Sequence, residues 1–259
     1  MTLLPAGDDG PCLFSIVTVC RNAKPSIAQT VESVLAQSAF AGTVEHVVID
    51  GASTDGTLDV LRSYPHLRVL SEPDAGVYDA MNKGVSRARG EYVGILNADD
   101  WYEPDALASV AEAFLAHPET SIVHGDIRRW NYSGPLNVVK PASTGPTGSL
   151  WAMPLHHPAS FARRELFNHF GPFDTTYRIF GDFEWVSRVI RGGALLYYCP
   201  RVLTNFRVGG LSTMRCSPAE RYRVFRAAGA NPIRALAAVS YGCAAVLRNQ
   251  VNAKRTFRG

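Results

Sequence analysis

The sequence predicts an α/β fold in which helices pack on both faces of a mainly parallel sheet. Apolar runs rich in β-branched residues alternate with helical patterns as far as Ala116. Continuous runs of this kind are typical of strands that are buried on both faces. Four of them end in polar clusters, and open parallel sheets bind ligands at the carboxyl ends of their strands. The polar chemistry is therefore expected on one edge of the sheet.

The first half of the chain predicts four strand–helix pairs. Short apolar runs predict strands at residues 13–19, 44–49, 67–70 and 92–96. Helical spacing of apolar residues follows each run, in segments that begin near Ser26, Asp55, Val77 and Pro104. Pro25 suits a helix start, and Thr54 and Asp55 can cap the second helix.

The second half is less regular. We expect strands at residues 121–127, 194–199 and 202–208, and helices at 163–170 and 182–190. Residues 133–148 are rich in Pro, Gly, Ser and Thr, which predicts a loop. From Pro218 onward the pattern is helical and basic.

The composition indicates a globular chain with a full core. The 259 residues are 46% hydrophobic, enough for one large domain. The five cysteines are an odd number without metal-site spacing, so we expect scattered, reduced thiols in a cytoplasmic protein. The first residues lack the basic region of a signal peptide, and the apolar segment 236–247 is too short to span a membrane.

Positive charge is concentrated at the end of the chain. From Arg215 onward, the only acidic residue among many arginines and lysines is Glu220. Such a segment favours an anionic partner, a membrane or nucleic acid, although a solvated helical face explains it equally well. Few aromatic residues are interleaved, which argues against nucleic acid. A basic amphipathic helix on anionic lipid is the more specific hypothesis.

Oxygen-bearing side chains follow the fourth expected strand. Asn97, Asp99 and Asp100 stand where this strand ends, and such ligands suit Mg²⁺ or Mn²⁺, which bridge to substrate phosphates. A turn that caps the next helix is the alternative. Asp50 ends the second strand, where it can accept hydrogen bonds from a nucleobase or ribose, whereas Asp55 favours a helix cap.

Residues 74–84 are unusually polar for the start of a packed helix. Asp79 and Asn82 lie one turn apart and Lys83 follows, so this face can present an amide and a cation to a nucleotide. A solvated helix face is the alternative. His157 stands beside His156 in a proline-flanked loop, where the pair does not suggest zinc and both a structural and a substrate-contacting role are open.

Taken together, these segments resemble the family 2 glycosyltransferases of the GT-A fold. The matching blocks occur in order: Thr18 and Asn22, residues 50–57, 74–84 and 97–101, His157 before Phe161, and residues 171–174 and 182–184. The segment 76–82 is similar to the subgroup that builds bacterial surface polysaccharides and glycolipids.

The resemblance implies a domain division. Residues 1–12 would be an N-terminal tail and residues 13–210 the GT-A domain. Its nucleotide-binding half would be 13–100 and its acceptor half 101–210. Residues 211–259 would form a basic helical extension.

The resemblance also implies a nucleotide-sugar site. The donor-binding residues would be Thr18, Asn22, Asp50, Ser53, Asp74, Asp79, Asn82, Lys83, Asn97 and His157. Asn97 and Asp99 match the ends of the family's Asp-x-Asp motif, so Asp99 would bind a divalent Mg²⁺ or Mn²⁺ ion and Asp100 would share it. Asn97 replaces the usual aspartate, which puts strict metal dependence in question.

Asp182 matches the family's catalytic base, although Gly181 stands where the family usually has glutamate. Asp182 also begins an expected helix, whose N-terminus favours an ionised carboxylate. Such a carboxylate can take the proton from an attacking hydroxyl. A helix cap without catalysis is the alternative. A single base on the acceptor side predicts one displacement that inverts the anomeric centre.

The resemblance thus implies an inverting enzyme that moves a sugar from a nucleotide-diphosphate sugar to a glycan or lipid-linked acceptor. No nucleic-acid partner is expected. The expected location is the cytoplasm, with peripheral contact at the inner face of the membrane. Two other classes stay open: a nucleotide- or glycan-binding module without catalysis, and a sugar nucleotidyltransferase. The latter needs a glycine-rich triphosphate loop, and residues 20–25 contain no glycine.

Overall fold

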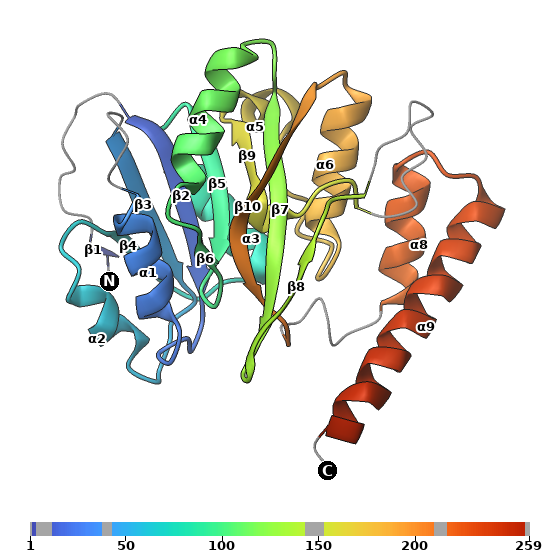
Figure 1. Ribbon diagram of the computed structural model, residues 1–259, viewed down its shortest axis with the longest axis horizontal. Helices are drawn as coiled ribbons and strands as arrows, with labels where there is room; N and C mark the ends of the chain where they lie inside the picture. Colours follow the sequence, from blue (N-terminus) through green and yellow to red (C-terminus); the bar gives the residue numbers. More distant parts are fainter. Residues whose placement is uncertain (1, 4–11, 38–42, 143–152, 210–216, 257–259) are drawn as a thin grey trace.

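The computed structural model describes residues 2–3, 12–37, 43–142, 153–209 and 217–256, so the predicted tail 1–12 lies mostly outside it. One sheet runs through this part of the chain (Figure 1). Its strands are β1 (Thr2–Leu3), β2 (Cys12–Cys20), β3 (Thr43–Asp50), β4 (Arg68–Ser71), β5 (Tyr92–Asn97), β6 (Trp101–Tyr102), β7 (Ile122–Asn131), β8 (Gly134–Val139), β9 (Ser160–Arg163) and β10 (Leu196–Arg207). Their order is β1-β4-β3-β2-β5-β9-β7-β10-β6, and β8 pairs with β7.

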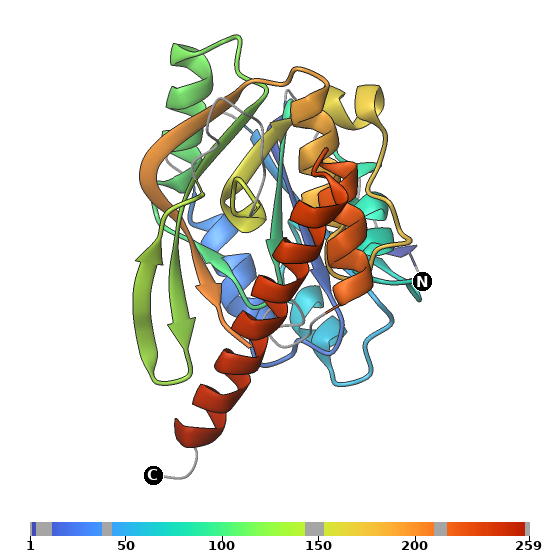
Figure 2. The same ribbon diagram turned by 90° about the vertical axis from the view of Figure 1, so that its right-hand side faces the viewer.

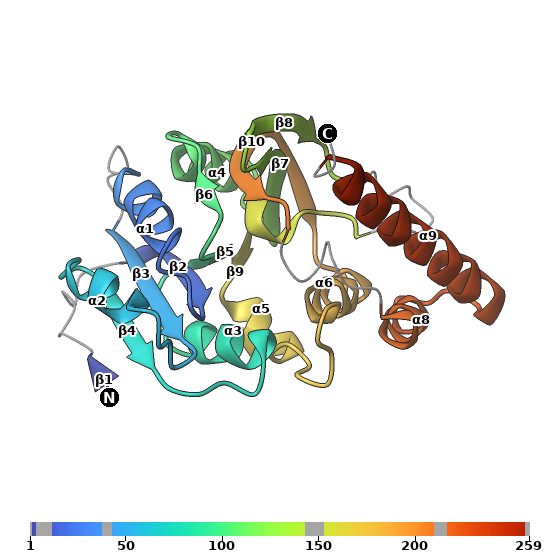
Figure 3. The ribbon, with the colours of Figure 1, turned by 90° about the horizontal axis from the view of Figure 1, so that it is seen from below.

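Helices cover both faces of the sheet. They are α1 (Ile27–Leu35), α2 (Thr57–Arg62), α3 (Val77–Val85), α4 (Ala106–Ala116), α5 (Glu165–Phe170), α6 (Gly181–Arg191), α8 (Pro218–Ala227) and α9 (Pro232–Thr256), with the 3-10 turn η1 (His157–Ala159). The view from below shows α1, α2 and α4 on one face and α3, α5 and α6 on the other (Figure 3). Because the long strands of the first half pair in parallel, the predicted α/β fold is confirmed.

Helix α3 lies unusually close to the sheet at Gly84. A Cβ on Gly84 would lie 2.2 Å from Val17 Cγ1 and 3.3 Å from Ile49 Cγ1, so no larger residue fits. Val17 and Ile49 are fully buried strand residues. This close approach brings the start of α3 to the carboxyl edge of β2 and β3, where the expected site residues lie.

The second half differs from the prediction in three places. Residues 134–139 form strand β8, so the predicted loop is wrong there, and its residues 143–148 lie outside the described ranges. The two strands expected at 194–208 are one strand, whose register against β7 shifts around Pro200. Residues 160–163 form a strand between β5 and β7, so the following helix begins only at Glu165.

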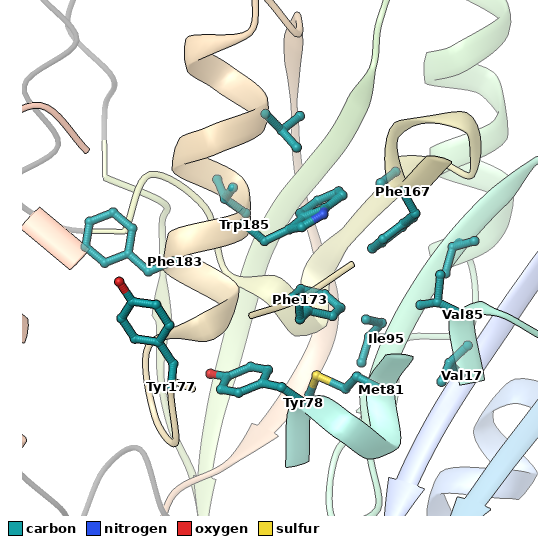
Figure 4. Packing of buried hydrophobic residues seen from close by; sticks show 14 of the residues in the cluster. Val17, Tyr78, Met81, Val85, Ile95, Phe167, Phe173, Tyr177, Phe183 and Trp185 are labelled. Carbon is teal, nitrogen blue, oxygen red and sulfur yellow. The ribbon is translucent and has the colours of Figure 1, made fainter. Parts of the chain in front are cut away.

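An aromatic core lies between the sheet and helices α3, α5 and α6 (Figure 4). Phe167 stacks on Trp185 with ring centroids 4.3 Å apart, and Phe173 lies 5.7 Å from Phe167. Helix α8 extends this core, because its buried Phe225 meets Phe183 of α6 edge-on at 5.2 Å. Residues 218–227 therefore share the core of the preceding domain.

The cysteines are not all reduced. Cys12, Cys20 and Cys199 are free thiols, whereas Cys243 in α9 is disulfide-bonded. The expectation of scattered reduced thiols is therefore wrong for Cys243. Within the described residues, no helix combines the length and the apolar character that crossing a bilayer requires.

Candidate active site

The loops after β2 and β3 form one end of the site. Asn22 N donates to Ser53 Oγ over 2.7 Å, and Thr54 N donates to Asn22 Oδ1 over 2.9 Å. Asn22 has a φ of 54°, a left-handed conformation that asparagine tolerates better than most residues. Asn22 and Ser53, both predicted to bind the donor, are therefore neighbours at the carboxyl edge of the sheet.

Asp50 organises this pair of loops from inside. Its side chain is fully buried, and its Oδ2 accepts hydrogen bonds from Ser53 N (3.0 Å) and Ser71 Oγ (2.7 Å). Thr18 lies deeper in β2, where its hydroxyl pairs with His46 Nε2 at 2.9 Å. Thr18 therefore does not reach the edge. Asp50 acts on the edge through Ser53, and its direct contact with a nucleotide stays a prediction.

Lys83 is surrounded by carboxylates. Its Nζ lies 2.7 Å from Asp74, 3.0 Å from Glu72 and 3.2 Å from Asp79. Burial alone would lower the pKa of Lys83, but the hydrogen bonds that Lys83 donates to Asp74, Glu72 and Asp79 outweigh it and raise the pKa. Three acids already balance the charge of Lys83, and its role as a cation for the diphosphate stays a prediction.

Arg21 is a second cation at this edge, and its side chain is exposed. A Cβ on Gly51 would lie 2.9 Å from Asp74 Oδ2 and 3.4 Å from Arg21 Cβ, so the glycine leaves room for both side chains. Among the described residues, none of the ion pairs at this edge involves Arg21. The sequence analysis did not single out Arg21, although its place directly after the first long strand was a usable signal.

Asn82 joins two of the resemblance blocks. Its Nδ2 donates to Phe173 O over 2.9 Å, and Phe173 N donates to its Oδ1 over 2.9 Å. Both halves of the amide are therefore used to hold residues 171–174 against α3. Each group of the amide has one partner in this segment and can form a second bond, so the contact between Asn82 and the donor stays a prediction.

Asp99 and Asp100 are neighbours in different environments. Asp100 is fully buried and accepts hydrogen bonds from Arg207 N (2.9 Å) and Asn97 Nδ2 (3.1 Å). Burial, and then the charge of Asp99, raise the pKa of Asp100 to about 7. Asp100 is fully buried and each of its oxygens already has a protein partner, and its share in a metal site stays a prediction. Asp99 is partly exposed, and burial also raises its pKa.

Asp99 and the Oδ1 of Asn97 are left as ligands for a divalent ion. Within the described part of the chain, no group of three or more His, Cys, Asp or Glu side chains can hold a metal. One carboxylate and one amide oxygen fit Mg²⁺ or Mn²⁺ only when water and a diphosphate supply the other ligands. The residues present therefore fit an ion that arrives with the donor.

Asp182 lies in the first turn of α6, and its carboxylate has partners from three segments. Its Oδ1 accepts a hydrogen bond from Phe183 N (2.9 Å) and lies 3.0 Å from the Tyr78 hydroxyl. Its Oδ2 lies 3.2 Å from His157 Nδ1, and 17% of the side chain is exposed. Burial alone would raise the pKa of Asp182, but the contacts with His157, Tyr78 and Phe183 N outweigh it and lower the pKa. The predicted base is thus ionised at neutral pH.

Tyr78 explains the glycine in front of Asp182. A Cβ on Gly181 would lie 2.8 Å from ring carbons of Tyr78. The ring is buried beside Phe173 with centroids 5.8 Å apart, and its hydroxyl donates to Ile179 O over 2.6 Å (Figure 4). The glutamate that the family usually has at this position finds no room. Tyr78 instead reaches the base, a role that the sequence analysis missed.

His157 interacts with two acidic residues of the site, Asp182 and Asp100. It pairs with Asp182, and its charge also lowers the pKa of Asp100 against the stronger effects of burial and Asp99. One imidazole therefore links the predicted base to the segment 97–100. A mainly apolar cavity of about 40 Å³ lies behind His157 and Asp182, too small for a sugar nucleotide. Contact of His157 with the diphosphate or the acceptor stays a prediction.

Fold and site together fit an α/β enzyme, with loops at the carboxyl edge of a parallel sheet and an ionised carboxylate, the predicted base, on a facing helix. The family profile described as Glycosyl transferase family 2 matches residues 15–253. The chain belongs to this family, which confirms the predicted class of enzyme.

Two relatives illustrate the range of the family. The PGL/p-HBAD biosynthesis glycosyltransferase of Mycobacterium tuberculosis (strain ATCC 25177 / H37Ra) is 33% identical over 214 residues, which are 77% of this chain and 79% of the relative. The hyaluronan synthase of Pasteurella multocida is 34% identical over 128 residues, which are 48% of this chain and 13% of the synthase.

Solved structures confirm the predicted GT-A fold. S. aureus TarS 1–349 in complex with UDP-GlcNAc has a TM-score of 0.67 at 18% identity, covering 86% of this chain and 69% of that chain. The mannosyltransferase PcManGT from Pyrobaculum calidifontis, in complex with GDP-Man and Mn²⁺, has a TM-score of 0.60 at 21% identity. That comparison covers 96% of this chain and 79% of that chain.

Proposed function

We propose that this glycosyltransferase moves a sugar from a nucleotide-diphosphate sugar to a hydroxyl of a glycan or lipid-linked acceptor, with inversion at the anomeric carbon. The observation that carries the proposal is the ionised, partly exposed carboxylate of Asp182. Among the described residues its partners are Tyr78, His157 and Phe183 N, and none of these is a second carboxylate. A single base suits a single displacement, whereas retention through a covalent intermediate needs a second carboxylate close enough to act as the nucleophile.

The reaction follows from this base. The acceptor oxygen attacks the anomeric carbon while the bond from that carbon to the diphosphate oxygen breaks, and the nucleoside diphosphate leaves with the electron pair. Asp182 takes the proton of the hydroxyl. Its lowered pKa means that it is unprotonated before the acceptor arrives. His157 and Phe183 N hold the carboxylate in one orientation, which limits the reorganisation needed during attack.

The donor end of the site would be formed by Asn22, Ser53 and Arg21, with Asn97 and Asp99 toward the diphosphate. A divalent Mg²⁺ or Mn²⁺ ion bound there would offset the charge that develops on the leaving diphosphate. The proteins of similar fold bind UDP-GlcNAc in one case and GDP-Man with Mn²⁺ in the other. Uridine and guanosine nucleotides are therefore the first classes to test.

We also propose that the acceptor is reached at a membrane surface, with peripheral binding at its inner face. Helix α9 turns Ile233, Leu236 and Tyr241 to solvent, while Ala235 and Ala238 are buried. An exposed apolar stripe in a basic segment suits an anionic lipid surface. Since α8 and α9 share the core with α6, substitutions such as Ile233→Ser test this contact better than removal of residues 211–259.

Donor binding and transfer test the function separately. Thermal unfolding with UDP-, dTDP- and GDP-sugars in Mn²⁺ identifies the donor, because a bound ligand raises the Tm. Asp182→Asn should keep this rise in Tm and lose about 100-fold or more in kcat. Asp59→Asn, which changes an exposed carboxylate of α2, is the control and should keep full activity. An unchanged kcat in Asp182→Asn, or a retained anomer by NMR of the product, would remove Asp182 as the inverting base.

A further inference from the structure

The β7–β8 hairpin extends past the carboxyl edge of the sheet, at the same end of the molecule as the loops after β2 and β3 (Figures 1 and 2). Asn131 pairs with Gly134, so residues 132 and 133 form the turn. In the sheet, β8 pairs with β7 alone, and its other edge has no partner strand among the described residues. The hairpin is therefore a projecting element beside the site.

Apolar side chains of this hairpin face solvent. Tyr132 is 92% exposed, Leu136 48% and Val138 46%. Since they lie on a turn and an edge strand, they contribute little to the core. A tyrosine at a projecting turn, followed by exposed aliphatic residues, has the composition that favours the interface between lipid and water.

The charge of the outer part of the hairpin, residues 127–142, has one sign. Residues 127–142 contain Arg128, Arg129 and Lys140 and no aspartate or glutamate. Arg128 pairs with Glu103 at 3.2 Å, and no ion pair of Arg129 or Lys140 occurs within the described residues. Cations beside exposed apolar residues attract anionic lipid headgroups, and the attraction adds to the burial of the apolar side chains.

We propose that the outer part of the hairpin, with Tyr132 at the turn and Leu136 and Val138 on β8, enters the headgroup region of an anionic membrane, while Arg129 and Lys140 farther from the turn attract its headgroups. It would hold the active edge of the sheet against the lipid. The inference rests on the proposed function and deepens it, because a lipid-linked acceptor would then reach Asp182 from the membrane side. The C-terminal end of α9 points toward the same end of the molecule, so helix and hairpin can contact one surface (Figures 1 and 2).

A second copy of the chain is the competing occupant of this edge strand. Pairing of two β8 strands would bring together hairpins that each carry Arg129 and Lys140 without an acidic residue. Repulsion between these like charges disfavours the pairing, which is how natural proteins protect edge strands. An anionic lipid surface can bind both the positive charges and the exposed apolar side chains of the hairpin.

The test is co-sedimentation of the full-length chain with phosphatidylcholine vesicles, with and without phosphatidylglycerol. Leu136→Ser/Val138→Ser should lower partitioning about tenfold or more, since apolar burial drives insertion. Arg129→Gln/Lys140→Gln should remove most of the preference for phosphatidylglycerol. Leu115→Ser is the matched control: Leu115 is 78% exposed near the end of α4, away from the hairpin, and its loss should change nothing.

Equal vesicle binding by wild type and the Leu136→Ser/Val138→Ser variant would overturn the proposal, as would no binding by wild type. Dimerisation in light scattering that this variant abolishes would assign the hairpin to a second copy instead. The rise in Tm with donor, measured without vesicles, shows that each variant is folded. If that rise persists while vesicle binding fails, the membrane proposal fails and the glycosyl-transfer proposal stands.

Discussion

A methyl group at Gly181 should destabilise the protein through Tyr78. Gly181→Ala would place a Cβ 2.8 Å from ring carbons of Tyr78, closer than real Cβ contacts. The ring is 4% exposed, and the bond from its hydroxyl to Ile179 O keeps it from moving aside. Overpacking of this kind costs about 1–3 kcal/mol. That exceeds the roughly 0.5–1 kcal/mol by which alanine is favoured over glycine in a helix. Each kcal/mol corresponds to about 2–4 °C in Tm for a chain of this size.

A double-mutant cycle isolates this contact. Tyr78→Ala alone should cost about 3–5 kcal/mol, the usual loss for a large buried ring. In that background Gly181→Ala meets no ring, so the coupling between the two substitutions should be about 1–3 kcal/mol, with the double variant more stable than additivity requires. Urea unfolding of the four proteins measures it. Additive losses, or a Gly181→Ala protein as stable as wild type, would show that Tyr78 is not the reason for the glycine.

Three further predictions concern charged groups. In the plot of kcat against pH, His157→Asn should move the acidic limb to higher pH. His157 is the largest contact that holds the pKa of Asp182 down against burial. An acidic limb at the same pH in both proteins contradicts this prediction. Relative to Asp100→Asn, the wild type should lose stability as pH rises from 3.8 to about 7, since burial raises the pKa of Asp100 and the folded chain holds this proton more tightly than the unfolded chain. Urea unfolding of both proteins measures this difference, and an equal dependence on pH counts against it. Lys83→Met should weaken nucleoside diphosphate binding less than Arg21→Ala in calorimetric titration, because three carboxylates already balance Lys83. A larger loss of binding in Lys83→Met than in Arg21→Ala would favour Lys83 as the cation at the donor site.

The first half of the fold was predictable because its long strands are buried on both faces. β2 and β5 are rich in apolar and β-branched residues that are buried, and such a segment between turn signals has few other stable environments. β8 was not predictable, since residues 134–139 are mostly exposed and contain Gly, Pro and Asn. Only pairing with β7 makes them a strand. β9 has four residues and depends on partners far away in the chain.

Part of the candidate site was predictable from single segments. The position of Asp182 at a helix start is an example, because the residues around it suffice to predict the helix. Its partner Tyr78 is 104 residues away, and no local pattern points its hydroxyl at Asp182. Asp99 and Asp100 show the same limit, because they are identical and adjacent in sequence. Only the packing of β10 against the loop, through the bond from Arg207 N, decides that Asp100 is the buried one.

Tyr78 and His157 should contribute unequally to the base. The Tyr78 hydroxyl has one proton and two acceptors, Ile179 O at 2.6 Å and Asp182 Oδ1 at 3.0 Å. The shorter bond takes the proton for most of the time. Asp182 Oδ1 already accepts from Phe183 N, so His157 is the main side-chain partner of the carboxylate. Tyr78→Phe should therefore lower kcat about tenfold or less, and His157→Asn should lower it more, since a bond to a charged group contributes roughly 1.5–3 kcal/mol. Steady-state rates at saturating donor and acceptor compare the two. A larger loss in Tyr78→Phe would mean that the hydroxyl proton belongs to Asp182 rather than to the Ile179 carbonyl.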